Sequence, residues 1–111
     1  MRETLARTQR FQERVFTAGE REYCERRGAV AAQHYAARFA AKEALLKALG
    51  TGWRDGIAWQ DVEVVNQEDG KPSLAITGKA REIADRLGVV TAHISLSHTA
   101  EHAIAQVILE K

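Results

Sequence analysis

The sequence predicts a single α+β domain in which a long central helix packs on a mostly antiparallel sheet. Helical periodicity dominates the chain up to Gly52, and alternation of apolar and polar residues becomes common after it. The 111 residues match the usual size of one domain with one core. We therefore treat residues 1–111 as one domain.

The opening segments predict two short helices. Residues 4–14 are amphipathic, with apolar residues on one side and arginines on the other. Thr17 and Glu20 have the spacing of a capping box, in which each residue satisfies a backbone N–H of the other. The helix that they begin is expected to run to about Arg27 and to stop at Gly28.

Residues 30–49 predict the long central helix, because they are rich in alanine and Gly50 stands where a helix end favours glycine. Glu43 and Lys47 share one face of this helix, whereas Arg38 lies about 140° from Glu43 around the axis. The spacing of Glu43 and Lys47 fits a solvated ion pair. It also fits a carboxylate for a hard cation such as Mg²⁺ with a lysine for phosphate.

The second half of the chain predicts strands and one helix. The stretch "QEDGKP" is rich in turn-forming residues and predicts a hairpin between the first two strands. In "TAHISLSH" the side chains alternate, which places His93 with the serines, and we expect it to be a hydrogen-bonded core histidine. The strands are expected at residues 57–66, 73–78, 91–98 and 102–110, and the helix at 79–88.

Composition excludes several classes of protein. A single cysteine, Cys24, rules out an internal disulfide framework and a cysteine zinc site, and it fits a reducing compartment. The chain shows no apolar run of the ~20 residues that span a bilayer, and no signal peptide pattern. We therefore expect a cytoplasmic protein.

Charge is distributed unevenly along the chain. Residues 1–54 hold 11 Lys and Arg against 6 Asp and Glu, whereas residues 55–111 hold 5 against 9. The basic first half suits an acidic partner, and the acidic second half argues against general nucleic-acid binding.

The segment "RFAAKEALLKALGTG" resembles the signature helix of the holo-acyl-carrier-protein synthases, a branch of the 4′-phosphopantetheinyl transferase superfamily. The family pattern Phe-x-x-Lys-Glu-Ala-x-x-Lys, followed by Gly-Thr-Gly, is complete here. Four more segments resemble the family in the same order, namely "RFQERVFTAGE", "WQDVEVVNQEDGKP", "HISLSHT" and "AIAQVILE". Together these segments cover nearly the whole chain.

The resemblance implies an enzyme of fatty acid biosynthesis and lipid metabolism. Such enzymes transfer 4′-phosphopantetheine from coenzyme A to a serine of apo-acyl-carrier protein and release adenosine 3′,5′-bisphosphate. They are usually homotrimers with active sites between subunits. Arg7 and Arg10 match the first helix of the family, which contacts the acidic carrier protein.

The resemblance also assigns site residues. Glu43 matches the family's Mg²⁺ ligand, and Lys47 matches the catalytic lysine at the pyrophosphate. The positions implied to bind coenzyme A near its nucleotide are Arg38, Gly50, Thr51, Gly52, His98 and Thr99. The resemblance gives His34 and His102 no role.

The family's opening strand, which reads approximately Gly-hydrophobic-Gly-x-Asp and supplies a second Mg²⁺ ligand, has no counterpart in this sequence. Three explanations are open: the true start lies upstream, the chain is an inactive or weakened relative, or another chain supplies the carboxylate. We favour the first. The alternative function is a non-catalytic module that binds carrier protein, and a nucleic-acid-binding module comes third.

Overall fold

The computed structural model describes residues 9–50 and 56–111, and it confirms the α+β prediction. Helices occupy the first half of the chain and strands most of the second half. The helical elements are α2 (Gln9–Val15), α3 (Ala18–Glu25), η1 (Gly28–Val30), α4 (Ala31–Leu49), η3 (Trp59–Asp61) and α5 (Gly78–Arg86). The strands are β1 (Val62–Asn66), β2 (Pro72–Ile76), β3 (Thr91–His98) and β4 (Ala103–Glu110).

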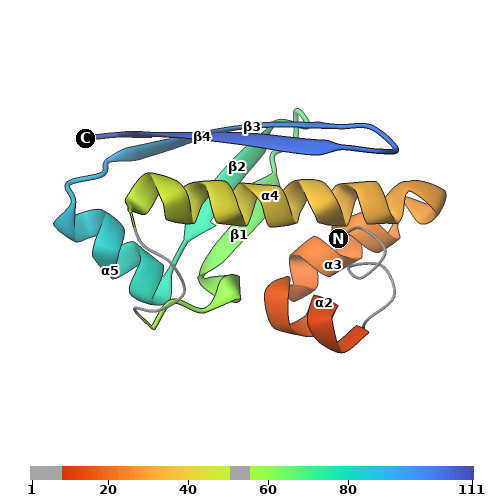
Figure 1. Cartoon of the computed structure of the whole chain (residues 1–111), viewed down its shortest axis with the longest axis horizontal. Helices are drawn as coiled ribbons and strands as arrows, with labels where there is room; N and C mark the ends of the chain where they lie inside the picture. Colours follow the sequence, from red (N-terminus) through yellow and green to blue (C-terminus); the bar gives the residue numbers. More distant parts are fainter. Residues whose placement is uncertain (1–8, 51–55) are drawn as a thin grey trace.

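Helix α4 crosses most of the length of the molecule, and the other elements are arranged around it (Figure 1). The β3–β4 hairpin runs along one side of α4, and helices α2 and α3 lie near its N-terminal half. Helix α5 lies beyond its C-terminal end. Among the described residues, no helix is both long and apolar enough to cross a membrane.

The strands form two antiparallel hairpins. In the first, Val62 pairs with Ile76, and in the second, His98 pairs with Ala103. The first strand was expected to begin at residue 57, but it begins at Val62 because residues 59–61 form a 3₁₀ turn. The Asp61 carboxylate accepts a hydrogen bond from the Ala58 N–H at 3.1 Å and stabilises this turn.

The predicted helix ends are confirmed at two positions. The Glu20 N–H donates to Thr17 Oγ1 at 3.2 Å, and the Thr17 N–H donates to Glu20 Oε1 at 3.0 Å, which completes the capping box. Gly50 has a φ of 74° and ends α4 in the left-handed conformation that glycine adopts without strain.

The buried apolar residues form two separate clusters along α4. One lies between α4 and the N-terminal helices, and its buried members are Val15, Phe16, Cys24, Tyr35, Ala36 and Phe39. The other lies between α4, β1 and α5, and its buried members are Leu45, Leu46, Leu49, Ile57, Val62, Ala80 and Ala84.

Lys42 of α4 forms a buried ion pair with Glu20 of α3. In the sequence, Lys42 stands between the α4 residues of the first cluster and those of the second. Lys42 Nζ lies 2.9 Å from Glu20 Oε1, and both side chains are fully buried. Lys42 Nζ also donates hydrogen bonds to the backbone carbonyls of Trp59, at 3.2 Å, and Val62. The charged ammonium group is therefore surrounded by oxygen acceptors instead of water.

The Glu20 carboxylate has partners of its own. In addition to Lys42 and the Thr17 N–H, it accepts a hydrogen bond from the Val64 N–H at 2.8 Å. One carboxylate thus connects the start of α3, the middle of α4 and strand β1. Burial lowers the pKa of Lys42, and the nearby Glu20 charge opposes this effect.

We predict that Lys42→Met destabilises the fold by about 3–5 kcal/mol, because it leaves the buried Glu20 charge without its cation. The double variant Lys42→Met/Glu20→Gln should lose less stability than the two single variants together, as chemical denaturation can measure. The control is Arg26→Met, which removes an exposed pair with Glu22 and should cost less than about 1 kcal/mol. Additive losses would show that Lys42 and Glu20 do not interact energetically.

Candidate active site

Helix α4 presents different functional groups in different directions. The side chains of Arg38 and Lys42 are buried, with 2% and 0% exposure, whereas Glu43 and Lys47 are exposed. This agrees with the sequence expectation that Arg38 and Glu43 lie on different faces. Lys42, which stands beside Glu43 in the family motif, belongs to the core and does not face a ligand.

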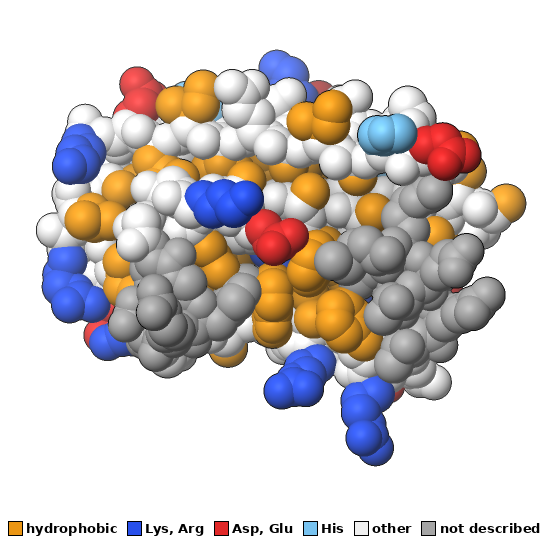
Figure 2. Space-filling view, viewed as in Figure 1, with side chains coloured by type: hydrophobic (Ala, Val, Ile, Leu, Met, Phe, Trp, Pro, Cys, Tyr) orange, Lys and Arg blue, Asp and Glu red, His pale blue; other side chains and the backbone are white. Residues whose placement is uncertain are grey.

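Glu43 and Lys47 form no ion pair with each other in the described structure, and Glu43 forms none with any other described residue. The solvated ion pair that their spacing permits is therefore not formed. Figure 2 shows a basic and an acidic side chain over the middle of α4, on a face where hydrophobic side chains are also visible. A carboxylate and an ammonium group on this face are available to an external ligand.

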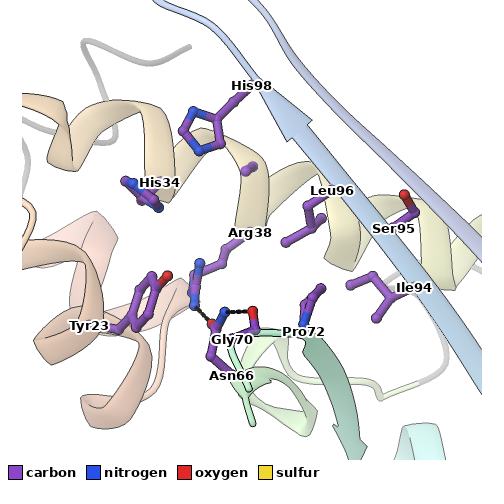
Figure 3. A pocket seen from close by; sticks show the side chains of 11 residues that line it. Tyr23, His34, Arg38, Asn66, Gly70, Pro72, Ile94, Ser95, Leu96 and His98 are labelled. Atoms are coloured by element: carbon purple, nitrogen blue, oxygen red, sulfur yellow. Dashed lines mark hydrogen bonds between the residues drawn. The ribbon is translucent and has the colours of Figure 1, made fainter. Parts of the chain in front are cut away.

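A pocket with a volume of about 290 Å³ lies on another side of α4 (Figure 3). It is formed by α3, α4, β3 and the turn between β1 and β2. Its lining combines cationic or titratable side chains with an aromatic ring and apolar groups. The lining residues are Tyr23, His34, Ala37, Arg38, Asn66, Gly70, Pro72, Ile94, Ser95, Leu96 and His98.

Arg38 is held in this pocket by two neighbours. Its Nη2 donates a hydrogen bond to Asn66 Oδ1, and its Cζ lies 4.0 Å from the centre of the Tyr23 ring. Asn66 is itself oriented by a bond from its Nδ2 to the Gly70 carbonyl, at 3.1 Å. The buried Nε of Arg38 has no hydrogen-bond partner among the described residues. A fixed guanidinium with an unused donor is suited to an anionic ligand.

His98 lies on the same pocket, as Figure 3 shows, although it comes from β3. Its Nδ1 lies 3.1 Å from Gln33 Oε1, and its ring centre lies 4.5 Å from that of His34. Arg38 and His98 therefore line one pocket. The family resemblance had implied that both bind coenzyme A. His34, Tyr23 and Asn66 were not assigned from the sequence.

A local signal for His34 does exist, because it precedes Arg38 by four residues and so shares its face of α4. Tyr23 and Asn66 carry no such signal. They reach the pocket from α3 and from the end of β1, and only the tertiary fold brings them beside Arg38.

Three other predicted site residues lie in the described structure. Gly50 forms the end of α4, as expected. The Thr99 Oγ1 accepts hydrogen bonds from the N–H groups of Glu101 and His102, at 3.2 and 3.1 Å, and so stabilises the turn between β3 and β4. Arg10 is exposed on α2. The expectations for Arg7, Thr51 and Gly52 fall outside the described residues.

The expectation for His93 is wrong. His93 is exposed on the outer face of β3 and pairs with Glu110 of β4, because the alternation of β3 turns Ile94 and Leu96 inward instead.

Cys24 is fully buried, and burial is the main effect that raises the pKa of its thiol to about 12. Cys24 is therefore not a thiolate nucleophile at neutral pH.

Within residues 9–50 and 56–111, no group of three or more His, Cys, Asp and Glu side chains is placed to hold a metal ion. Glu43 is the exposed carboxylate of the motif. Mg²⁺ is often held by one or two carboxylates together with substrate phosphates. The donor set of this chain thus fits a Mg²⁺ ion whose coordination a phosphate ligand and water complete.

Comparison with known proteins decides the family. The model of the 4′-phosphopantetheinyl transferase superfamily matches residues 1–107. The chain belongs to this superfamily. The holo-[acyl-carrier-protein] synthase of Geobacter sp. (strain M21) is 52% identical over 99 residues, a match that covers 89% of this chain and 78% of the relative.

Solved structures of the superfamily have the same fold. The Chronobacterium ammoniagenes ACPS–CoA complex matches with a TM-score of 0.82 and 30% identity, covering 97% of this chain and 86% of that one. A Bacillus anthracis holo-(acyl-carrier-protein) synthase in complex with CoA (3′,5′-ADP) matches with a TM-score of 0.72 and 40% identity, covering 90% and 79%. These matches confirm the resemblance and the predicted fold class.

Proposed function

We propose that this chain is a holo-acyl-carrier-protein synthase. It transfers 4′-phosphopantetheine from coenzyme A to a serine of apo-acyl-carrier protein and releases adenosine 3′,5′-bisphosphate. The observation that carries the proposal is the pocket lined by the buried Arg38 and the partly buried His98, which together can bind an anion. The same helix carries the exposed Glu43 and Lys47 on a different face.

The reaction is a displacement at phosphorus. The serine Oγ attacks the β-phosphorus of coenzyme A, a new P–O bond forms, and the bond to adenosine 3′,5′-bisphosphate breaks. The serine proton is lost to solvent or to a base. Charge accumulates on the pyrophosphate oxygens, so the enzyme mainly has to position the two substrates and neutralise charge.

The nucleotide end of coenzyme A belongs in the pocket. Arg38 supplies a donor that has no partner among the described residues, and His98 lines the same pocket, so the two together suit the 3′-phosphate. In this proposal Gly50, Thr51 and Gly52 also contact the nucleotide, as does Thr99, which follows β3 in the sequence. The CoA named in the two solved relatives supports this assignment.

The pyrophosphate belongs with Glu43 and Lys47. Glu43 would hold Mg²⁺, which supplies charge neutralisation at the pyrophosphate oxygens when bound. Lys47, one turn further along α4, would contact the pyrophosphate directly. Its side chain is exposed and can therefore reach a ligand on this face of α4.

The two ends of the ligand fit best between copies of the chain. Arg38 is buried in its pocket and Glu43 faces outward from α4, so one coenzyme A can contact Arg38 of one copy and Glu43 of another. Ile104 and Ile108 are 65% and 54% exposed on the outer face of the β3–β4 hairpin, an apolar surface that association would cover. We therefore propose a homotrimer with active sites between subunits.

The carrier protein is proposed to bind at the basic N-terminal helix. Arg10 is exposed on α2, and Arg7 precedes it in sequence. Opposite charges at such a surface accelerate association and set orientation. We place the reaction in fatty acid biosynthesis and lipid metabolism in the cytoplasm.

A non-catalytic module that binds carrier protein is the second candidate. It is favoured by one observation, namely that the described residues offer no cluster of ligands for a metal ion. It differs from the first proposal in a measurable way, because it binds carrier protein without any turnover of coenzyme A.

We predict that Glu43→Gln lowers kcat by at least about 100-fold, since metal charge stabilisation is worth several kcal/mol. The melting temperature should stay the same, because Glu43 is exposed and outside the core. The measurement is a carrier-protein modification assay by mass spectrometry. The control Glu82→Gln removes an exposed carboxylate of α5 and should keep full activity. Near-normal turnover of Glu43→Gln would exclude Glu43 from the mechanism.

We also predict that Arg10→Glu raises KM for apo-carrier protein by about 3- to 30-fold, which corresponds to one or two lost surface charge contacts. KM for coenzyme A should change little, because Arg10 lies on α2, outside the pocket. Added salt should reduce the difference between variant and wild type. If instead KM for coenzyme A rises, α2 contacts the nucleotide and the assignment to carrier protein is wrong.

A further inference from the structure

His34 occupies the centre of an aromatic and cationic cluster that the proposed reaction does not yet use. Its ring makes an edge contact with His98, with ring centres 4.5 Å apart, and another with Tyr23 at 5.6 Å. It lines the same pocket as Arg38, on the same face of α4 (Figure 3). An imidazole in this position has ring nitrogens close to any ligand that Arg38 binds.

The charged groups near His34 are the cations Arg38 and Arg27, and the other titratable groups near it are His98 and Tyr23. Arg38 comes from its own helix, His98 from β3, and Tyr23 from α3. Arg27 lies just beyond α3, with its Cζ 3.9 Å from the centre of the Tyr23 ring. No Asp or Glu is among the described residues that line the pocket. Protonation of His34 in the empty pocket therefore adds a positive charge to an already basic site.

The protonation state of His34 follows from these neighbours. Burial is the largest effect, and together with His98, Arg38 and Arg27 it lowers the pKa of His34 to about 4. His34 is thus neutral at pH 7 unless a ligand changes its surroundings. A dianion bound beside Arg38 reverses the electrostatic part of this effect, because the added negative charge favours an imidazolium.

The buried Nε of Arg38 gives an independent reason to expect an anion. Arg38 is only 2% exposed, and its Nε has no partner among the described residues. A donor left unpaired in a pocket costs free energy until a ligand accepts its hydrogen bond.

We propose that His34 is a second imidazole of the phosphate site, in ring contact with His98, and that His34 takes up a proton from solvent when a phosphomonoester dianion binds beside Arg38. The inference rests on the proposed function, in which the 3′-phosphate of coenzyme A is that dianion. The pair then favours coenzyme A over dephospho-coenzyme A, and more strongly so as the pH falls.

The test is calorimetric titration of the whole chain with coenzyme A at pH 7.5, in two buffers of different ionisation enthalpy. At this pH a phosphomonoester is mostly dianionic. We expect net uptake of protons when coenzyme A binds, so that its binding tightens as the pH falls from 8.5 to 6.5. Dephospho-coenzyme A should bind without proton uptake.

Two variants assign the proton to His34. His34→Gln retains hydrogen-bonding groups, and His34→Phe retains the ring that packs on Tyr23 and His98. Both should still bind coenzyme A, with proton uptake reduced to near zero and a dissociation constant that changes little with pH. The control His102→Gln alters an exposed histidine outside the pocket and should behave as wild type.

The outcomes separate this inference from the proposed function. Coenzyme A binding without proton uptake, or with uptake that persists in both His34 variants, would overturn the role of His34 and leave the transferase proposal intact. A wild-type chain that does not bind coenzyme A at all would overturn both.

Discussion

The Lys42–Glu20 ion pair fixes the rotation of helix α4, and the position of each functional side chain follows from that rotation. An unpaired charge in this place would carry a large desolvation cost, so the fold retains the contact that satisfies both groups. Once Lys42 points toward Glu20 and the start of β1, Arg38 must face the pocket and Glu43 must face solvent. Lys42 of the signature motif is thus structural, and the chemistry is proposed for Glu43 and Lys47, which are exposed.

In the proposed function, one helix serves two ends of a long ligand. The Arg38 side has an enclosed pocket with aromatic and imidazole groups, which suits a nucleotide and its phosphate. The Glu43 side is open, which suits a reacting pyrophosphate that a protein partner must reach. Arg38 and Glu43 lie on different faces of α4. In the proposed trimer, one bound coenzyme A therefore contacts Arg38 of one copy and Glu43 of a second copy.

Local sequence patterns predicted the elements whose causes are local. The capping box of Thr17 and Glu20, the glycine at the end of α4 and the alternation of β3 each act within a few residues, and all three are confirmed. The start of β1 was missed because Asp61 stabilises a turn, which an apolar pattern does not reveal. The burial of Lys42 depends on Glu20, a partner distant in sequence that single-sequence reasoning could not find. The spacing from Arg38 could have placed His34 on the same face of α4, but its contact with His98 depends on the tertiary fold.

The central claim, that Arg38 and Glu43 act on the same coenzyme A from different subunits, is tested most directly by subunit complementation. Arg38→Met and Glu43→Gln would be purified separately and also co-expressed, and transfer to apo-carrier protein would be measured for each preparation. Random mixing in a trimer leaves about a quarter of the sites with both residues intact, so co-expression should restore about a quarter of wild-type turnover. Turnover no higher than that of the separate variants would show that both residues serve the same site from one chain.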